Sequence, residues 1–187
     1  MTPTDKIAFL DRDGTLNFDP GYLNRPDELR LIPGVAQALK NLKLAGYDLV
    51  VVSNQSGISR GLIEPLVLEQ IHARMNELLL LESGVEIDEF AICPHHPDEG
   101  CVCRKPHPTL LLEVAQRKSI LMNRTVMIGD KYSDISAGIR AGCRYTIQVL
   151  TGAGTSERAN QVASADEPSY IAEDLARAVS WLLKKPI

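Results

Sequence analysis

Two acidic residues are separated by one residue in the segment Asp11-Arg12-Asp13-Gly14-Thr15, directly after a short apolar run. Their like charges are tolerable side by side only when a cation lies between them, which predicts a hard divalent metal. One carboxylate can attack phosphorus and form an acyl phosphate, while the other protonates the leaving oxygen and then activates water. Asp-Gly is also a common turn dipeptide, so this motif alone does not decide between chemistry and a simple turn.

A hydroxyl group and an ammonium group elsewhere in the chain could serve the same chemistry. Ser53 and Asn54 end a β-branched run. A serine there can donate to a phosphate oxygen, although capping a helix is the commoner role of an isolated serine. Lys105 precedes Pro106, which favours an extended backbone, and could neutralise a transferring phosphoryl group. The alternative for this lysine is a solvated surface charge.

A second pair of acids follows another apolar run, Met127-Ile128-Gly129. Asp130 ends that run and would complete a metal site with the first acidic segment. Asp134 comes one helical turn later and would fix the loop behind the metal ligands. An ordinary acid in the first turn of a helix, favoured by the helix dipole, is the alternative for Asp134.

The segment between Cys93 and Cys103 has the donor set of a metal site. It holds three of the four cysteines of the chain, together with His95 and His96. Thiolate and imidazole together select Zn²⁺, which is tetrahedral and structural when all four ligands come from the protein. We expect zinc on Cys93, His95, Cys101 and Cys103, with His96 as the rival nitrogen ligand.

This zinc loop, residues 93–103, is expected to hold Arg104 and Lys105 in place. Plain buried thiols are the alternative reading, but they do not need to cluster, and a disulfide is disfavoured in a cytoplasmic protein. His72 is expected on the solvated side of a long helix and His107 in a proline-rich loop, neither with a catalytic role.

Strand and helix patterns alternate along the chain. Strands are expected at 7–10, 49–52, 85–92, 125–128 and 145–150, helices at 35–45, 64–82, 110–117, 133–141 and 170–183, and a mobile surface loop at 152–165. This alternation predicts an α/β fold, a Rossmann-like doubly wound parallel sheet with helices on both faces. Ligands of such sheets lie beyond the carboxyl ends of the strands, where 11–15, 53–56 and 129–134 converge.

The bulk properties restrict the function further. A length of 187 residues suits one domain, 1–187. The net charge of -4 argues against a nucleic-acid partner, and we expect a small-molecule substrate instead. No apolar run is long enough to span a bilayer and the start lacks an apolar signal core, so a cytoplasmic protein is expected. The sequence shows no evident exposed apolar stripe, which favours a monomer.

Together these motifs resemble the haloacid dehalogenase superfamily of phosphotransferases over nearly the whole chain. The resemblance implies that Asp11 is the nucleophile and Asp13 the general acid/base, whose presence favours fast hydrolysis. It implies Mg²⁺ ligands from Asp11, the main-chain carbonyl of Asp13, and Asp130. Ser53 and Lys105 would stabilise the phosphoryl group. No connection has room for a separate cap domain, so we expect a capless body with an open site.

Two branches of the superfamily combine such a body with this zinc loop. One removes the 7-phosphate of D-glycero-D-manno-heptose 1,7-bisphosphate in lipopolysaccharide and surface-sugar synthesis, and the other hydrolyses histidinol phosphate. The chain is most similar to the heptose branch, with the histidinol branch as the alternative. The similarity implies substrate contacts from Asp19, Pro20, Gly21, Tyr22, Ser53, Asn54, Gln55, Ser56, Arg104, Lys105 and Lys131. A binding module with a vestigial site is disfavoured because both Asp11 and Asp13 are present.

Overall fold

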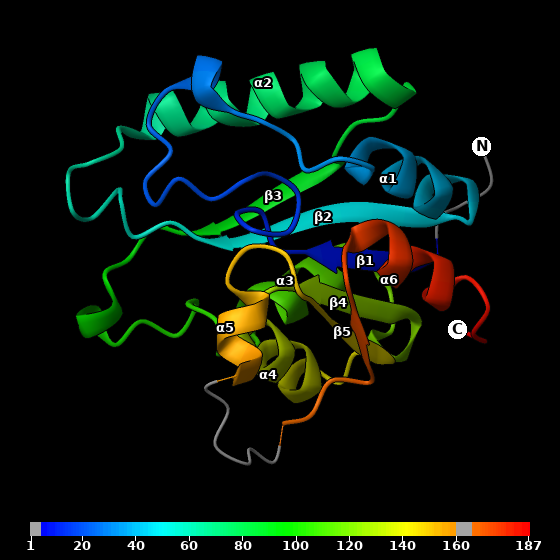
Figure 1. Cartoon of the computed structure of the whole chain (residues 1–187). Helices are drawn as coiled ribbons and strands as arrows, with labels where there is room; N and C mark the ends of the chain where they lie inside the picture. Colours follow the sequence, from blue (N-terminus) through cyan, green and yellow to red (C-terminus); the bar gives the residue numbers. More distant parts are fainter. Residues whose placement is uncertain (1–4, 160–165) are drawn as a thin grey trace.

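The computed structural model of the chain describes residues 5–159 and 166–187 (Figure 1). Its strands are β1 Lys6–Leu10, β2 Tyr47–Asn54, β3 Glu89–Cys93, β4 Thr125–Gly129, β5 Tyr145–Val149 and β6 Tyr170–Ala172. Its helices are α1 Val35–Leu44, α2 Pro65–Ser83, α3 Thr109–Arg117, α4 Tyr132–Ala141, α5 Gly154–Ala159 and α6 Leu175–Leu182. Short 3-10 turns lie at Pro26–Glu28, Pro97–Glu99 and Met122–Arg124.

The six strands form one parallel sheet in the order β3-β2-β1-β4-β5-β6. β1 lies in the middle, where Ile7 pairs with Asp48 of β2 on one side and with Thr125 of β4 on the other. The chain therefore winds outward from β1 first in one direction and then in the other. Such a switch point opens a crevice at the carboxyl ends of β1 and β4. The predicted doubly wound parallel sheet is confirmed.

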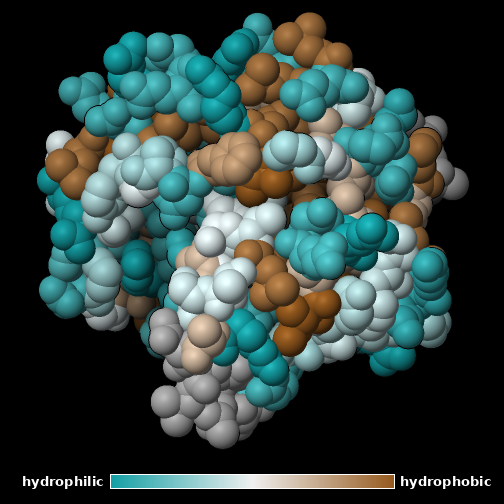
Figure 2. Space-filling view, viewed as in Figure 1, coloured by the Kyte–Doolittle hydropathy of each residue, from teal (hydrophilic) through white to brown (hydrophobic). Residues whose placement is uncertain are grey.

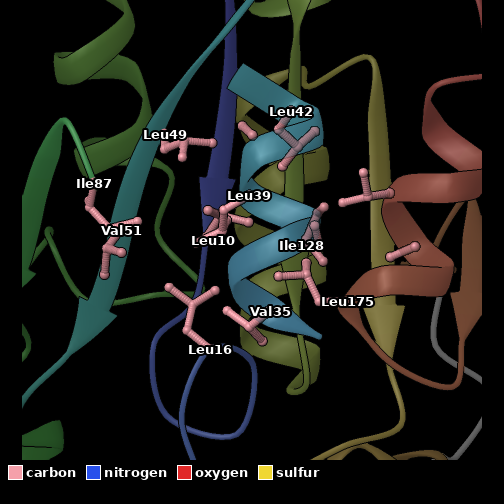
Figure 3. Packing of buried hydrophobic residues seen from close by; sticks show 14 of the residues in the cluster. Leu10, Leu16, Val35, Leu39, Leu42, Leu49, Val51, Ile87, Ile128 and Leu175 are labelled. Carbon is pink, nitrogen blue, oxygen red and sulfur yellow. The ribbon is translucent and has the colours of Figure 1, made fainter. Parts of the chain in front are cut away.

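Helices cover both faces of the sheet, with α1 and α2 on one face and α3 and α4 on the other (Figure 1). α6 packs beside α1. In Figure 3, Val35, Leu39 and Leu42 of α1 lie over Leu10 of β1 and Ile128 of β4. These side chains are buried because the central strands are apolar on both faces, as parallel strands between two helical layers must be.

α4 approaches the sheet closely because Gly138 has no side chain. A Cβ atom at this position would lie 2.7 Å from both Met127 Cβ and Thr146 Cγ2, well inside van der Waals contact. The helix therefore rests directly on β4 and β5. This close packing fixes the start of α4, where Asp134 lies, against the end of β4.

One predicted strand is shorter than expected. A strand was expected at 85–92, but β3 begins only at Glu89. The reason is a local side chain: an oxygen of the Asp88 carboxylate accepts the N–H of Leu49 at 2.7 Å, and the Asp88 N–H donates to the Leu49 carbonyl at 2.9 Å. The carboxylate thus takes the place of the strand carbonyl that would otherwise accept the Leu49 N–H.

Two further predictions at the C-terminal end are wrong. Instead of one helix over 170–183, residues 170–172 form the edge strand β6, and α6 begins after Asp174, whose carboxylate accepts the N–H of Arg177 at 2.8 Å. Within the expected loop 152–165, residues 154–159 form α5. Residues 160–165 lie outside the described part of the chain.

The surface in Figure 2 carries hydrophobic residues in several separate groups among hydrophilic ones. The helices of the described ranges include none long and apolar enough to cross a membrane.

Two leucines on α1 test this account of the core. Leu39 is 0% exposed and Leu44 is 79% exposed. Leu39→Ala should lower the free energy of unfolding by about 2–5 kcal/mol, because it leaves a cavity beneath α1. The matched variant Leu44→Ala should change it by less than about 0.5 kcal/mol. Urea titrations followed by circular dichroism measure both values, and equal losses would contradict the packing described here.

Candidate active site

The loop after β1 begins as a continuation of the sheet. The Asp11 N–H donates to the carbonyl of Ile128 at 2.9 Å, so Asp11 is fixed beside the end of β4. The chain then turns tightly, with the N–H groups of Leu16 and Asn17 both donating to the Arg12 carbonyl. Gly14 makes this turn possible, because its φ is +86° and a side chain there would collide with the carboxylate of Asp130.

Three buried carboxylates meet at this point. Asp11, Asp130 and Asp134 each place an oxygen within 4.8 Å of the other two. Burial, followed by the charges of Asp11 and Asp134, raises the pKa of Asp130 to about 8. Burial also raises the pKa of Asp134 to about 6. Asp130 Oδ1 is buried without a hydrogen-bond partner among the described residues. Hard carboxylate oxygens, one of them unpartnered, are the donor set that fits Mg²⁺.

Lys105 lies directly against two of these acids. Its Nζ is 2.6 Å from Asp11 Oδ1 and 2.6 Å from Asp134 Oδ1, and it also donates to the Val52 carbonyl. Burial lowers the pKa of Lys105, but the charges of Asp11 and Asp134 outweigh burial and raise it, so the ammonium stays charged. The side chain of Asn54 holds the Lys105 backbone with two hydrogen bonds of 3.0 Å.

Asp13 is held by a different set of partners. Arg12 donates to both of its oxygens, from Nε at 3.1 Å and from Nη2 at 2.8 Å. Asn17 Nδ2 donates to Oδ1 at 2.9 Å, and Gln55 Nε2 donates to Oδ2 at 2.8 Å. Burial alone would raise the pKa of Asp13, but the Arg12 charge and these hydrogen bonds lower it. The Asp13 carboxylate is therefore turned toward these donors.

The predicted site residues line two adjoining cavities. The first, of about 40 Å³, is lined by Asp11, Asp13, Ser53, Asn54, Lys105, Lys131, Ser133 and Asp134. The second, of about 300 Å³, is lined by Asp13, Asp19, Gly21, Tyr22, Asn54, Gln55, Ser56, Gly57, Arg104 and Lys131. Of the residues expected to contact substrate, Pro20 alone lines neither cavity, although it lies in the same loop. The two spaces share Asp13, Asn54 and Lys131, so one ligand can occupy both.

The segment after β5 also closes on the acidic centre, which the sequence did not reveal. Thr151 Oγ1 donates to the Gly14 carbonyl at 2.6 Å, and the Ala153 N–H donates to Asp130 Oδ2 at 2.8 Å. The backbones of Gly14 and Gly152 touch here, and a side chain on Gly152 would strike Asp130 as well. The one signal of this close approach in the sequence is Gly152, which lies in a polar stretch. Taken alone, this pattern indicates the start of a surface loop.

His72 is half-buried rather than solvated, so its expected place on the helix is wrong. Its ring stacks on Phe90 with a centroid distance of 4.0 Å. Burial, with a further contribution from the Arg12 charge, lowers the pKa of His72 to about 4. The imidazole is therefore neutral near pH 7. It occupies the apolar side of α2 because its ring can stack there.

The cysteine-rich segment folds into a compact cluster. Cys93 Sγ lies 3.2 Å from Cys103 Sγ and 3.6 Å from Cys101 Sγ, and His95 Nδ1 lies 3.2 Å from Cys103 Sγ. All three thiols are free. The four donor atoms thus lie around one point, and thiolates with an imidazole are ligands that Zn²⁺ takes, so the donor set fits Zn²⁺. His96 Nδ1 instead accepts the N–H of Asp98 at 3.2 Å.

Relatives with established names give the family. The D-glycero-D-manno-heptose-1,7-bisphosphate 7-phosphatase of Thermosynechococcus vestitus is 41% identical, with 94% of each chain covered. The D-glycero-beta-D-manno-heptose-1,7-bisphosphate 7-phosphatase of Photorhabdus laumondii is 39% identical, with 98% of this chain and 100% of the relative covered. The chain belongs to the heptose-bisphosphate phosphatase family.

Two further comparisons agree with this family. The HAD-hydrolase-like family matches residues 102–178, which confirms the superfamily resemblance. The crystal structure of the D,D-heptose 1,7-bisphosphate phosphatase from B. bronchiseptica, complexed with magnesium and phosphate, is 35% identical with a TM-score of 0.88. It covers 97% of this chain, and this chain covers 99% of it.

The carboxylate cluster predicts a pH-dependent response to Mg²⁺. The pKa values of Asp130 and Asp134 rise from 3.8 to about 8 and about 6, so the folded protein keeps protons that the unfolded chain releases. Without metal, this contribution to stability is present below pH 4 and is lost as the pH rises toward 8. Mg²⁺ prefers ionised carboxylates as ligands, so saturating Mg²⁺ should raise the melting temperature more at pH 8 than at pH 5.

Differential scanning fluorimetry measures the Mg²⁺-induced shift in melting temperature at each pH. MgCl₂ is added at about 10 mM, which is on the order of saturation for a weak oxygen-ligand site. Asp130→Asn is the control variant, because it should remove most of the Mg²⁺ response at both pH values. A Mg²⁺ response of equal size in the variant and the natural protein would contradict the proposed cation site.

Proposed function

We propose that this protein is a Mg²⁺-dependent phosphatase that removes the 7-phosphate of D-glycero-D-manno-heptose 1,7-bisphosphate through an aspartyl-phosphate on Asp11. The observation that carries the proposal is the buried Asp11 carboxylate. Lys105 holds one of its oxygens at 2.6 Å, in a small cavity that opens into a larger polar one. The names of relatives that match nearly the whole chain supply the substrate.

In the first step, an Asp11 oxygen attacks phosphorus and the bond from phosphorus to the sugar oxygen breaks. Lys105 and Ser53 stabilise the charge on the phosphoryl oxygens, and Asp13 gives a proton to the departing sugar oxygen. Mg²⁺ held by Asp11, Asp130 and the Asp13 carbonyl would supply further positive charge there. In the second step, water attacks the acyl phosphate, its proton passes to Asp13, and inorganic phosphate leaves.

The positive charges of the larger cavity favour a second phosphate over an imidazole at the distal end of the substrate. Arg104 donates to the His95 carbonyl at 3.4 Å, which leaves further N–H groups of its guanidinium for a ligand. Lys131, near Asp19 at 3.6 Å, lies across the same cavity. Histidinol phosphate has an imidazole at its distal end and an ammonium group close to its phosphate, so it offers Arg104 and Lys131 no second anion to bind. A bisphosphate instead gains charge-assisted hydrogen bonds.

We also propose that the cluster of Cys93, His95, Cys101 and Cys103 holds a structural zinc ion. Four protein donors close the site, so no position is left for a reacting water. The cluster lies immediately before Arg104 and Lys105 in the chain, and it supports the loop that carries them. A single domain over residues 1–187, a cytoplasmic location and a monomeric state remain predictions from the sequence.

The substrate proposal predicts a large difference between two phosphates. kcat/KM for D-glycero-D-manno-heptose 1,7-bisphosphate should exceed kcat/KM for histidinol phosphate by about 10- to 100-fold, since a distal phosphate gains roughly 1.5–3 kcal/mol from charged partners. Phosphate release in the presence of Mg²⁺ measures both values. Asp11→Asn is the control and should remove turnover of both substrates. A preference for histidinol phosphate would reject the proposed substrate but not the mechanism.

The zinc proposal predicts the metal content and a loss of stability. Protein purified without added metal should contain about one zinc per chain by mass spectrometry of the metal, because four protein ligands bind it tightly. Cys101→Ser should lower the zinc content and the melting temperature, whereas Cys143→Ser, outside the cluster, should leave the zinc content unchanged. A folded protein that contains no zinc would disprove this part of the proposal.

A further inference from the structure

Gln55 lies where the phosphoryl-binding and acid/base groups meet, and it is only 5% exposed. Its Nε2 donates to Asp13 Oδ2 at 2.8 Å and to Ser53 Oγ at 2.8 Å. Its backbone N–H donates to the carbonyl of Cys93 at 2.7 Å. One residue therefore connects three places: its side chain bonds Ser53 of β2 and Asp13 of the loop after β1, and its backbone bonds the first residue of the zinc loop.

The hydrogen bond to Ser53 determines where the serine hydroxyl points. A hydroxyl group has one proton to donate and two lone pairs that accept. Because the Ser53 oxygen accepts from Gln55, its own proton remains free to donate in another direction. Ser53 lines the small cavity together with Asp11 and Lys105. The proton is therefore available to a phosphoryl oxygen in that cavity.

The hydrogen bond to Asp13 fixes the distance between two loops. The other donors to the Asp13 carboxylate, Arg12 and Asn17, belong to the same loop as Asp13 and move with it. Gln55 comes from the end of β2, the strand that also carries Ser53. Among the donors to Asp13 in the described residues, Gln55 is thus the one that sets the position of Asp13 relative to the phosphoryl-binding strand.

We propose that Gln55 is a positioning residue that places the general acid/base Asp13 and the Ser53 hydroxyl around the phosphoryl group, instead of serving mainly as a substrate contact. The inference rests on the proposed function, since it assigns Asp13 and Ser53 their roles in that reaction. Gln55 itself forms and breaks no bond. Its loss should slow the step in which Asp13 takes a proton from water, while the substrate still binds.

The aryl ester para-nitrophenyl phosphate separates the two steps. Asp11 attacks its phosphorus, and nitrophenolate leaves without needing a proton, so the first step does not depend on Asp13. In the second step, water attacks the phosphoryl group, its proton goes to Asp13, and the Asp11 carboxylate is released with inorganic phosphate. A defect in the position of Asp13 therefore appears as a burst of nitrophenolate followed by slow turnover.

The test compares three variants in stopped-flow absorbance with Mg²⁺ present. Gln55→Met keeps the length of the side chain and removes both N–H donors. It should show a burst approaching one nitrophenolate per active site and a steady-state kcat about 10- to 100-fold lower, with KM lowered in proportion, because kcat/KM for this ester depends on the first step alone. Asp13→Asn should show the same burst with a kcat about 10²- to 10⁴-fold lower, the range for losing a general acid/base. Ser59→Ala, an exposed change in the same loop, should match the natural protein.

A substrate-contact role predicts a different pattern, namely a raised KM without a burst, and that result would overturn the inference. A Gln55→Met protein with unchanged kcat and KM would overturn it too. If Gln55→Met does not fold, Gln55→Asn keeps the amide but withdraws it by one methylene, and the same burst is expected. Asp11→Asn separates a failure of the proposed function from a failure of this inference. Activity retained in Asp11→Asn rejects the proposed function itself. An inactive Asp11→Asn protein, together with no burst in either Gln55 variant, rejects only the role of Gln55.

Discussion

A buried ammonium group between two carboxylates is the constraint on which this site depends. Lys105 is 3% exposed and lies between Asp11 and Asp134, with Asp130 completing the acidic group. Burying charges is unfavourable unless they are paired and hydrogen-bonded, and removing one partner leaves the others uncompensated. Three acids and one lysine still leave an excess of negative charge, which a bound divalent cation would balance. The same excess of buried carboxylates therefore makes the site acidic and favours a bound cation.

The surrounding structure serves to hold this ammonium group in place. The side chain of Asn54, at the end of β2, forms two hydrogen bonds with the Lys105 backbone, and the Val52 carbonyl accepts a hydrogen bond from Lys105 Nζ. The Cys/His cluster precedes Lys105 in the chain, and its first residue, Cys93, accepts the N–H of Gln55. The sheet, the cluster and the loop that carries Asp13 are therefore connected by hydrogen bonds. A displacement of any one of them would shift Lys105 or Asp13.

The sequence predicted the parts of the site that are carried by motifs at strand ends. Asp11, Lys105 and Asp130 were foreseen because each follows a recognisable local pattern, and the doubly wound sheet then required their loops to converge. The hydrogen bond from Gln55 to Asp13 and the closure of Thr151 and Ala153 on the acidic centre were not foreseen. These are hydrogen bonds between segments far apart in the chain, and no local periodicity encodes them.

The errors in the predicted bounds of the strands and helices have a similar cause. Residues 85–88 and 170–173 have apolar patterns that fit a strand and a helix. Single polar side chains decided otherwise, since Asp88 accepts a strand N–H and Asp174 caps a helix one turn later than the periodicity indicated. Hydrophobic patterning thus located the elements, while side-chain hydrogen bonds to the backbone set where they begin.

The central position of β1 in the sheet has a consequence for how the chain folds. β1 pairs with β4, so that Ile7 lies opposite Thr125, more than half the chain away. Contacts at such large sequence separation form slowly, because a long loop must be closed before they contribute energy. During synthesis, Asp11 is therefore made long before Asp130, the residue that it lies beside in the folded protein. The group of Asp11, Asp130 and Asp134 can therefore form only after β4 has paired with β1.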